Sequence, residues 1–455
     1  MTPPPPPLIT PRPQHSGSTL LAWLIIAACV ALVVIRNDRA AQLAEKDGDP
    51  IAPLQLKCYG RMVVGIKSAI KLKWGMAPLK QNLKEDKLID SMDKLATSAD
   101  DKLKVAIIAG EINGADQAMA RLEGLAKADN SPELTQDIAT LRAIYQNGVG
   151  SLDPPARASL AKHQGYFGQV ALAYGVADDR EPRQSLEQAG VRFIALVALA
   201  GLGILLLLLA SFVCFILAIV FIASGKIRRA YVPDPAASSA YLEAFALYLV
   251  VFIAFGFVVR QFNLDILHWE WLALLIIPLA MYWTARRGAT AAQRQNAFGW
   301  IWGRGPHIEI PLGIAGYLAC LPIEFLGVVI SARLAKMADA HPTHPILRML
   351  DGDIWHVLAI YGLACGLAPV LEETMFRGAL FHHLRRRWGW FISALVVAFI
   401  FAIIHPQGWT LVPALGSFAL VVAALREWRG SILAPMAAHA FSNFVVVSMA
   451  MLFLR

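Results

Sequence analysis

The chain has 455 residues, of which 57% are hydrophobic and 16% charged, and its mean hydropathy is +0.52. Average soluble domains carry about 25% charged residues, so this composition excludes an ordinary soluble protein and indicates a membrane protein. The net charge of +8 fits the Lys and Arg excess of cytoplasmic loops. No basic stripe interleaved with aromatic residues occurs, so no nucleic-acid partner is expected.

The N-terminal residues predict a tail followed by a membrane anchor. Residues 1–18 are rich in proline and are expected to be disordered. Residues 19–35 form an apolar run just long enough to span a bilayer. A cleaved signal peptide is the alternative, but little positive charge precedes the run and no small-x-small cleavage site follows it. An uncleaved transmembrane anchor is therefore predicted.

Residues 36–190 have the composition of a soluble domain with nearly balanced charges. Apolar residues recur at three- and four-residue spacing over 103–126, 133–148 and 156–175, which predicts helices separated by Gly, Asn or Pro. These runs loosely resemble the hairpins of helical-repeat modules, although no repeat period is established. A small helical domain of unassigned role is the favoured interpretation, and docking of a protein partner is the other.

From residue 191 onward the chain is predicted to be membrane-embedded. The candidate spans are 193–223, 238–259, 267–285, 310–331, 354–384, 389–405, 409–425 and 431–454. Together with the anchor they predict an all-α polytopic membrane helical bundle of about eight or nine transmembrane helices, with the soluble helical domain inserted after the first span. The predicted organisation is a tail at 1–18, an anchor at 19–35, a soluble domain at 36–190, membrane helices at 191–350 and a catalytic membrane core at 351–455.

Basic clusters set the predicted orientation in the membrane. Three of them, at 226–229, 285–287 and 384–387, each follow a predicted span. The turns between spans alternate consistently between the two sides of the membrane if all three clusters are cytoplasmic. Residues 36–190 are then extracytoplasmic, although Arg36 and Arg39 argue against this. The Ala-rich chain with its Pro-rich leader suggests a multi-pass protein of the bacterial inner (plasma) membrane.

The stretch LEETMFR places three ionisable groups inside a predicted span: Glu372, Glu373 and Arg377. A charge at mid-bilayer costs about 2.5 to 3.5 kcal/mol on insertion scales, so such residues indicate function. Glu373 and Arg377 are four residues apart on a helix and are expected to form an ion pair. Glu372 is not neutralised by that pair, and a free carboxylate at a small wet cavity suits a general base.

Further polar residues occur in two of the later spans. Phe401 and His405 are four residues apart, with Pro406 expected to terminate or kink the helix just after the histidine. His439 and Asn443 have the same spacing in the last span. At ~1.5 Å per residue, Glu372 and these polar residues fall within the middle of the bilayer, where they can converge. Helix packing is the alternative role for each of them taken singly.

These motifs resemble those of the CAAX protease and bacteriocin-processing (CPBP/Abi) family of intramembrane peptidases, which includes the type II CAAX prenyl proteases. The family pattern EExxxR, FxxxH and HxxxN is matched in order by Glu372-Glu373 with Arg377, by Phe401 with His405, and by His439 with Asn443. The resemblance covers about residues 351–455 and says nothing about residues 36–190.

The resemblance implies a site in which a glutamate activates water. Glu372 is then the base, His405 orients the water, and His439 with Asn443 stabilises the oxyanion, while Glu373, Arg377 and Phe401 are supporting residues. A zinc site formed by Glu372, His405 and His439 is the less favoured alternative. Zinc-bound histidines need orienting partners, and Ser442 is the one side chain nearby in the sequence that offers such a partner. No cofactor is therefore predicted.

The predicted function is an intramembrane endopeptidase acting on a peptide or protein substrate at the lipid bilayer. A prenylated substrate is expected only in a host that makes prenylated proteins; peptide maturation, bacteriocin immunity and cleavage of a membrane regulator are the other options. A non-catalytic membrane scaffold or receptor is the main alternative, and a transporter ranks last because no internal symmetry is evident. Glu243, Glu270 and Glu324, in or near spans, are expected to have packing or interfacial roles.

Overall fold

Every regular element in the described part of the chain is a helix, and no strand occurs there, in a computed structural model of the protein. The described residues are 16–46, 52–71, 85–128, 131–234, 238–338, 340 and 352–454. The predicted all-α class is therefore confirmed. Residues 1–15, which make up most of the predicted Pro-rich tail, lie outside the described residues.

The chain divides into two compact units, which are described separately below. We call one the membrane unit and the other the helical unit. The membrane unit comprises Met1–Gln42 and Leu206–Ser448, and the helical unit comprises Leu43–Leu205 and Met449–Arg455.

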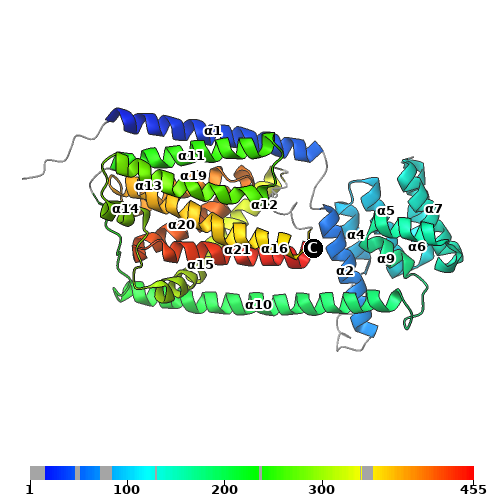
Figure 1. The fold of residues 1–455 in the computed structure, drawn as a ribbon. Helices are drawn as coiled ribbons and strands as arrows, with labels where there is room; N and C mark the ends of the chain where they lie inside the picture. The colour runs from blue at the N-terminus through cyan, green and yellow to red at the C-terminus, as the bar shows by residue number, and fades with distance from the viewer. Residues whose placement is uncertain are drawn as a thin grey trace, which may run out of the picture. The chain divides into compact units, whose positions relative to one another are not determined.

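The membrane unit is built from apolar helices joined mostly by short turns (Figure 1). Its elements are α1 (Ser16–Lys46), the end of α10 (Arg183–Ala223), α11 (Ser238–Gln261), α12 (Ile266–Trp269), η2 (Glu270–Leu275), α13 (Ile276–Arg286), α14 (Ala291–Phe298), α15 (Pro306–Met337), α16 (Ile354–Tyr361), η4 (Gly362–Leu367), α17 (Ala368–Glu373), η5 (Thr374–Leu380), α18 (Phe381–Arg385), α19 (Trp390–Ile403), η6 (Trp409–Leu411), α20 (Val412–Arg429) and α21 (Leu433–Leu454).

Seven helices among the described residues are long and apolar enough to cross a membrane. The prediction of a multi-pass membrane protein is therefore confirmed. The seven segments are Gly17–Arg39, Arg183–Ala223, Ser239–Gln261, Pro306–Met337, Ile354–Arg385, Trp409–Arg429 and Leu433–Phe453.

Two of the nine predicted spans take a different form. Residues 267–285 are divided among α12, the 3-10 segment η2 and α13. Residues 389–405 contain the 14-residue helix α19, which is about 21 Å long at ~1.5 Å per residue. A bilayer core is about 30 Å thick, so α19 is shorter than a full span.

Helix α1 is an integral part of the membrane unit rather than a detached anchor. Ala22 and Ile26 are each 2% exposed and belong to the hydrophobic core of this unit. The ring of Trp23 lies 6.2 Å from that of His383. The apolar run predicted as an anchor therefore also buries side chains in the core of the membrane unit.

The helical unit consists of short helices around a core of its own. They are α2 (Ala52–Lys71), α4 (Glu85–Leu95), α5 (Ala99–Asn113), α6 (Ala115–Ala128), α7 (Pro132–Asn147), η1 (Val149–Ser151), α8 (Pro154–Gln164), α9 (Tyr166–Leu172) and the beginning of α10. Helix α5 is the most enclosed: its N-terminus is closed by a capping box formed by Ser98 and Asp101, and Val105 and Ile108 are fully buried.

One predicted helical pattern is divided in the structure. Apolar periodicity runs through 103–126, but α5 ends at Asn113 and α6 starts at Ala115. Gly114, between them, has a φ of +92°, a conformation that side-chain-bearing residues rarely adopt. Two consecutive helices with apolar residues at similar spacing therefore look like one long helix in the sequence.

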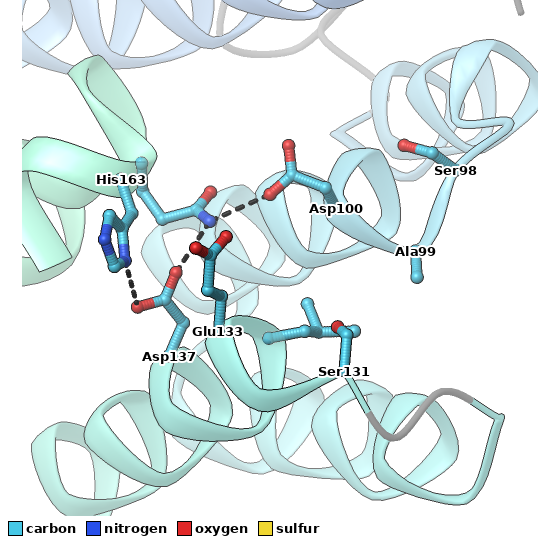
Figure 2. Close-up of a pocket in the computed structure, with 9 residues that line it drawn as sticks. Ser98, Ala99, Asp100, Ser131, Glu133, Asp137 and His163 are labelled. Atoms are coloured by element: carbon cyan, nitrogen blue, oxygen red, sulfur yellow. Dashed lines mark hydrogen bonds and ion pairs between the residues drawn. The ribbon is translucent and has the colours of Figure 1, made fainter. Parts of the chain in front are cut away.

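A polar pocket of about 450 Å³ lies in the helical unit (Figure 2). The Gln164 amide donates hydrogen bonds to Asp100 Oδ1 and Asp137 Oδ2, both at 2.9 Å. His163 Nδ1 lies 3.4 Å from Asp137 Oδ1, and Lys104 Nζ lies 2.7 Å from Asp100 Oδ2. The buried carboxylate of Asp137 is thus satisfied from within the pocket wall.

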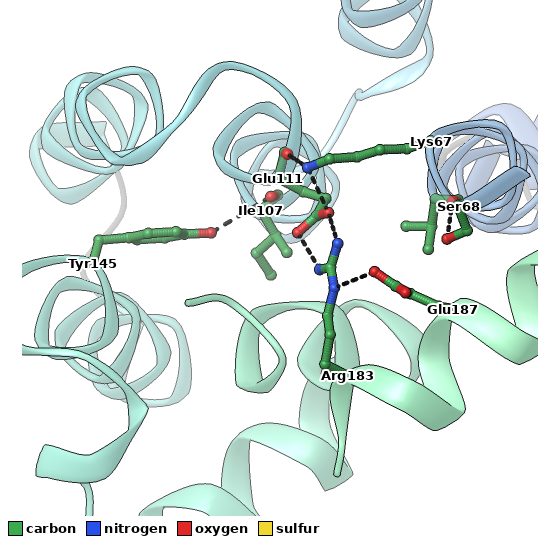
Figure 3. A network of polar contacts seen from close by, with 8 residues as sticks. Lys67, Ser68, Ile107, Glu111, Tyr145, Arg183 and Glu187 are labelled. Carbon is green, nitrogen blue, oxygen red and sulfur yellow. Dashed lines mark hydrogen bonds and ion pairs between the residues drawn. The ribbon is translucent and has the colours of Figure 1, made fainter. Parts of the chain in front are cut away.

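A buried ion-pair network joins α2, α5 and the start of α10 (Figure 3). Arg183 binds both carboxylate oxygens of Glu111, at 2.9 and 3.0 Å, and Lys67 Nζ lies 2.9 Å from Glu111 Oε1. Arg183 also reaches Glu187 at 2.9 Å. Burial by itself would raise the pKa of Glu111, but the hydrogen bonds and charges of Arg183 and Lys67 outweigh it and hold that pKa below its usual value.

Candidate active site

The two adjacent glutamates lie on a helix that is interrupted twice by π-helical turns. Ile354–Arg385 runs as one long helix in which η4 and η5 are π-helical, and α17 between them carries Glu372 and Glu373. π-Turns are rare, insert an extra residue into the helix and occur frequently at functional sites. The carboxylates are therefore presented from a short α-helical turn with altered backbone on both sides.

The predicted ion pair between Glu373 and Arg377 is present and fully buried. Arg377 Nη1 donates to Glu373 Oε1 at 3.0 Å, and both side chains are 0% exposed. Arg377 Nη2 also donates to the carbonyl of Ala419 on α20, at 3.0 Å. The ion pair therefore fastens the glutamate helix to α20.

Phe401 on α19 is a packing centre for the site. Its ring lies 4.3 Å from that of His405 and 6.2 Å from that of His439, and the guanidinium carbon of Arg377 lies 4.8 Å from its centroid. The side chain is 1% exposed. The aromatic residue of the FxxxH motif thus brings the two histidines and the buried arginine around one ring.

His439 on α21 lies against both glutamates. Its Nδ1 is 2.8 Å from Glu373 Oε1, and its Nε2 is 3.9 Å from Glu372 Oε2. The ionised carboxylate of Glu373 can only accept a hydrogen bond, so Nδ1 carries the proton of this contact. In the neutral imidazole Nε2 is then free to accept. The sequence interpretation did not predict this contact, because it grouped His439 with Asn443 alone.

Glu372 is the carboxylate that remains free. Its side chain is 23% exposed, against 0% for Glu373. Glu372 Oε2 has no hydrogen-bond partner among the described residues. The expected division between one paired and one unpaired carboxylate is therefore present in the geometry.

His405 lies just beyond α19, not on it. The helix ends at Ile403, and His405 precedes Pro406, whose ring disfavours helical backbone at the preceding residue. The prediction that the helix extends to His405 is therefore wrong by two residues. The four-residue link persists nevertheless, because His405 Nδ1 lies 2.5 Å from the Phe401 carbonyl. Asn37 on α1 donates to the His405 carbonyl at 3.1 Å.

Asn443 lies on α21, one turn after His439. Its Nδ2 donates to the carbonyl of Ala364, in the π-helical segment η4, at 2.7 Å. An amide nitrogen has two donors, so this bond leaves a second N–H on Asn443. The structure thus joins Glu372, Glu373, Arg377 and His439 by direct contacts, links His405 to them through Phe401, and fixes Asn443 to the glutamate helix.

The argument that the histidines have poor orienting partners is wrong. Both have one: Glu373 for His439 and the Phe401 carbonyl for His405. Ser442, which the sequence suggested for this role, instead accepts a hydrogen bond from Tyr317 at 3.1 Å. No group of three or more His, Cys, Asp and Glu side chains in the described part of the chain is spaced to hold a metal ion.

Comparison with known proteins locates the similarity in the same region. Residues 354–445 match the family model described as Type II CAAX prenyl endopeptidase Rce1-like. The chain is also 27% identical over 134 residues to an uncharacterized 24.3 kDa protein of Escherichia coli, which covers 28% of this chain. The match spans 60% of that protein's length. No solved structure matches the chain.

Proposed function

Because the chain belongs, over residues 354–445, to the family of type II CAAX prenyl endopeptidase-like proteins, we propose that it is an intramembrane endopeptidase in which Glu372 activates water. One observation carries the mechanistic proposal. Glu372 Oε2, without a hydrogen-bond partner in the described residues, faces His439 Nε2 across 3.9 Å. Polar groups at such a separation are commonly bridged by a water molecule.

In this mechanism the bridging water donates one hydrogen bond to Glu372 and one to His439 Nε2. Glu372 takes a proton from the water as its oxygen forms a bond to the carbonyl carbon of the scissile peptide. The carbonyl electron pair moves onto its oxygen, giving a tetrahedral oxyanion. When the C–N bond breaks, Glu372 returns the proton to the departing nitrogen, and a carboxyl group and an amine are released.

Two further residues are proposed to act on the oxyanion and the water. The second N–H of Asn443 is available to the oxyanion, and its bond to Ala364 would hold the amide in place. His405, oriented through the Phe401 carbonyl, is proposed to position the water or the substrate carbonyl. Glu373 and Arg377 support the site by fixing the ring of His439.

The proposed reaction needs no bound metal. Glu372 Oε2 has no hydrogen-bond partner in the described residues, so it can take a proton from water, while Glu373 is bound to Arg377 and His439. We further propose that the chain resides in a bacterial plasma membrane with residues 36–190 outside the cytoplasm. The helical unit is then the candidate docking region for a protein partner.

The test compares full-length protein with its Glu372→Gln variant. Both are purified in detergent and incubated with a mixture of membrane-derived peptides, and new peptide termini are identified by mass spectrometry. We expect cleavage by the parent protein and none above background by the variant. Glu243→Gln, at a carboxylate bonded to Trp283 and Arg287, is the control and should remain active. Cleavage by Glu372→Gln at the parent rate would show that another group is the base.

A further inference from the structure

A short 3-10 segment, η2, packs against the helix that carries the candidate base. It interrupts the predicted span 267–285 and contacts both η4 and α17. The approach is close: a Cβ atom added to Gly362 in η4 would lie 3.1 Å from the ring of Trp271. The first residue of η2 is Glu270. Sequence reasoning assigned this carboxylate a packing or interfacial role.

Glu270 is a partly buried carboxylate with no hydrogen bond or ion pair to any other residue that the structure describes. Glu270 begins the segment η2, which contacts the helix α17 that carries Glu372, so the two carboxylates repel each other electrostatically. A carboxylate partly removed from water is stabilised by a cation or a donor, and no side chain that the structure describes supplies either to Glu270. Contacts within the protein therefore do not explain why a carboxylate lies at this position beside the site.

The charges around the site are unbalanced. Three carboxylates, Glu270, Glu372 and Glu373, lie in this region, and Arg377 is the cation that directly pairs with one of them. The guanidinium of Arg377 is already bound to Glu373 and to the carbonyl of Ala419. An approaching substrate therefore meets an electronegative site in which positive charge is favoured and negative charge is repelled.

The residues on either side of Glu270 indicate where this charge lies relative to the bilayer. Trp269 and Trp271 are 45% and 42% exposed, respectively. Exposed tryptophans are enriched at the boundary between membrane and water, where their rings are partly apolar and partly polar. The ends of membrane spans are also where Lys and Arg concentrate in membrane proteins. Glu270 is thus placed to meet the boundary segment of a membrane-anchored substrate.

We propose that Glu270 is a specificity-determining residue that pairs with a Lys or Arg side chain next to the scissile bond. The inference rests on the peptidase function proposed above and names its substrate class: membrane-anchored peptides cut beside a basic residue at the membrane boundary. The cation offsets the uncompensated charge of Glu270 and holds the neighbouring peptide bond over Glu372. One charge-assisted hydrogen bond of this kind corresponds to about a tenfold preference in kcat/KM.

The test uses synthetic peptides in liposomes, each with one apolar spanning segment followed by a boundary residue that is Lys, norleucine or Glu. For the parent protein, kcat/KM should fall in that order, with about a tenfold step from Lys to norleucine. Glu270→Gln should cleave the norleucine peptide at the parent rate and lose the preference for Lys. Glu270→Lys should favour the Glu peptide, and Glu270→Asp should restore the preference for Lys.

The outcomes separate this inference from the proposed function. Equal cleavage of the three peptides by the parent protein, or an unchanged Lys preference in Glu270→Gln, would overturn the role of Glu270 while leaving the peptidase in place. Loss of folded Glu270→Gln protein would not obscure the answer, because Glu270→Lys and Glu270→Asp test the same charge: an unchanged preference for Lys in Glu270→Lys would overturn the role of Glu270. Absence of cleavage of every peptide by the parent would count against the peptidase itself, whereas full activity of Glu372→Gln would count against Glu372 as its base. Glu243→Gln is the matched control and should keep the parent order.

Discussion

Replacing Glu373 by glutamine would remove a charge on which two other site groups depend. Glu373 Oε1 accepts hydrogen bonds from Arg377 Nη1 at 3.0 Å and from His439 Nδ1 at 2.8 Å. All of this lies out of water, since Glu373 and Arg377 are 0% exposed and His439 is 4% exposed. The substitution keeps the shape of the side chain, so its effects report on the charge.

Two separate losses follow from this geometry. The amide oxygen of the introduced glutamine could still accept a hydrogen bond from Arg377, as the Ala419 carbonyl does, but the charge of Arg377 would be left unpaired. Removing one partner of a buried ion pair costs about 3 to 5 kcal/mol. His439 would lose the carboxylate that fixes its tautomer and ring, and removing such an orienting partner typically lowers activity about 10- to 100-fold. Stability and activity should therefore both fall.

A double variant distinguishes the two effects. Glu373→Leu with Arg377→Met replaces the ion pair by apolar groups, which at buried sites is often neutral for stability. We expect it to regain most of the free energy of unfolding that Glu373→Gln loses, and to remain inactive because His439 is still unoriented. Unfolding is followed by circular dichroism during titration with denaturing detergent, and activity by peptide cleavage.

Glu243→Gln is the control for the size of the effect. Glu243 forms a 2.8 Å ion pair with Arg287, and the two side chains are 10% and 32% exposed, so its loss should cost less than that of the fully buried pair. The reasoning would be refuted if Glu373→Gln unfolded at the same detergent fraction as the parent. It would equally be refuted if the double variant recovered activity along with stability.

Three further outcomes are expected. Purified protein should contain well under one zinc per chain and stay active after dialysis against a chelator. Stoichiometric zinc, with activity lost when the zinc is removed and restored when it is returned, would overturn the metal-free proposal. His439→Ala and Asn443→Ala should both be folded but severely impaired in cleavage. His439→Ala loses the acceptor that holds the water, and Asn443→Ala loses an oxyanion donor, which costs on the order of 10²-fold in rate. Loss of folded protein in both would instead favour a packing role and a non-catalytic scaffold. The helical unit should loosen as pH falls below about 4.5, the usual pKa of the Glu111 carboxyl, because that pKa is lowered in the folded state. The Glu111 carboxylate contributes its full stabilisation at pH values above its pKa in the unfolded state. This stabilisation is lost as the pH falls through the lower pKa that Glu111 has in the folded state. Glu111→Gln should therefore flatten the pH dependence of hydrogen exchange in α5.

Local spacing was sufficient to predict the buried ion pair and the main spans. Glu373 and Arg377 pair because residues four apart share a helix face, and this holds even though Arg377 lies in a π-helical turn. Long apolar runs predict spans because a bilayer core of about 30 Å requires about 20 apolar residues in helical form. The ion pair and the spans both depend on residues that are close together in the sequence, so both can be predicted from it.

Contacts between distant segments were not predictable in this way. The sequence does not tell that His439 meets Glu373, 66 residues away, or that Asn443 bonds to Ala364. Nor does it tell that Asn37, in the anchor helix, reaches the His405 carbonyl, 368 residues along the chain. Each of these bonds depends on which helices lie side by side, and apolar helices have many nearly equivalent ways to pack.

The sequence by itself determined the class of protein, the motifs and the division between a paired and an unpaired glutamate, because these follow from composition and from spacing along a helix. The tertiary structure decided the π-helical turns around Glu372, the end of α19 before His405, and the place of Glu270 beside the site. A π-turn is a single i→i+5 turn inside an α-helix, so it is too short to leave a recognisable pattern of apolar residues in the sequence. Glu270 belongs to no motif, and only the folding of η2 against α17 gives its charge a neighbour to act on.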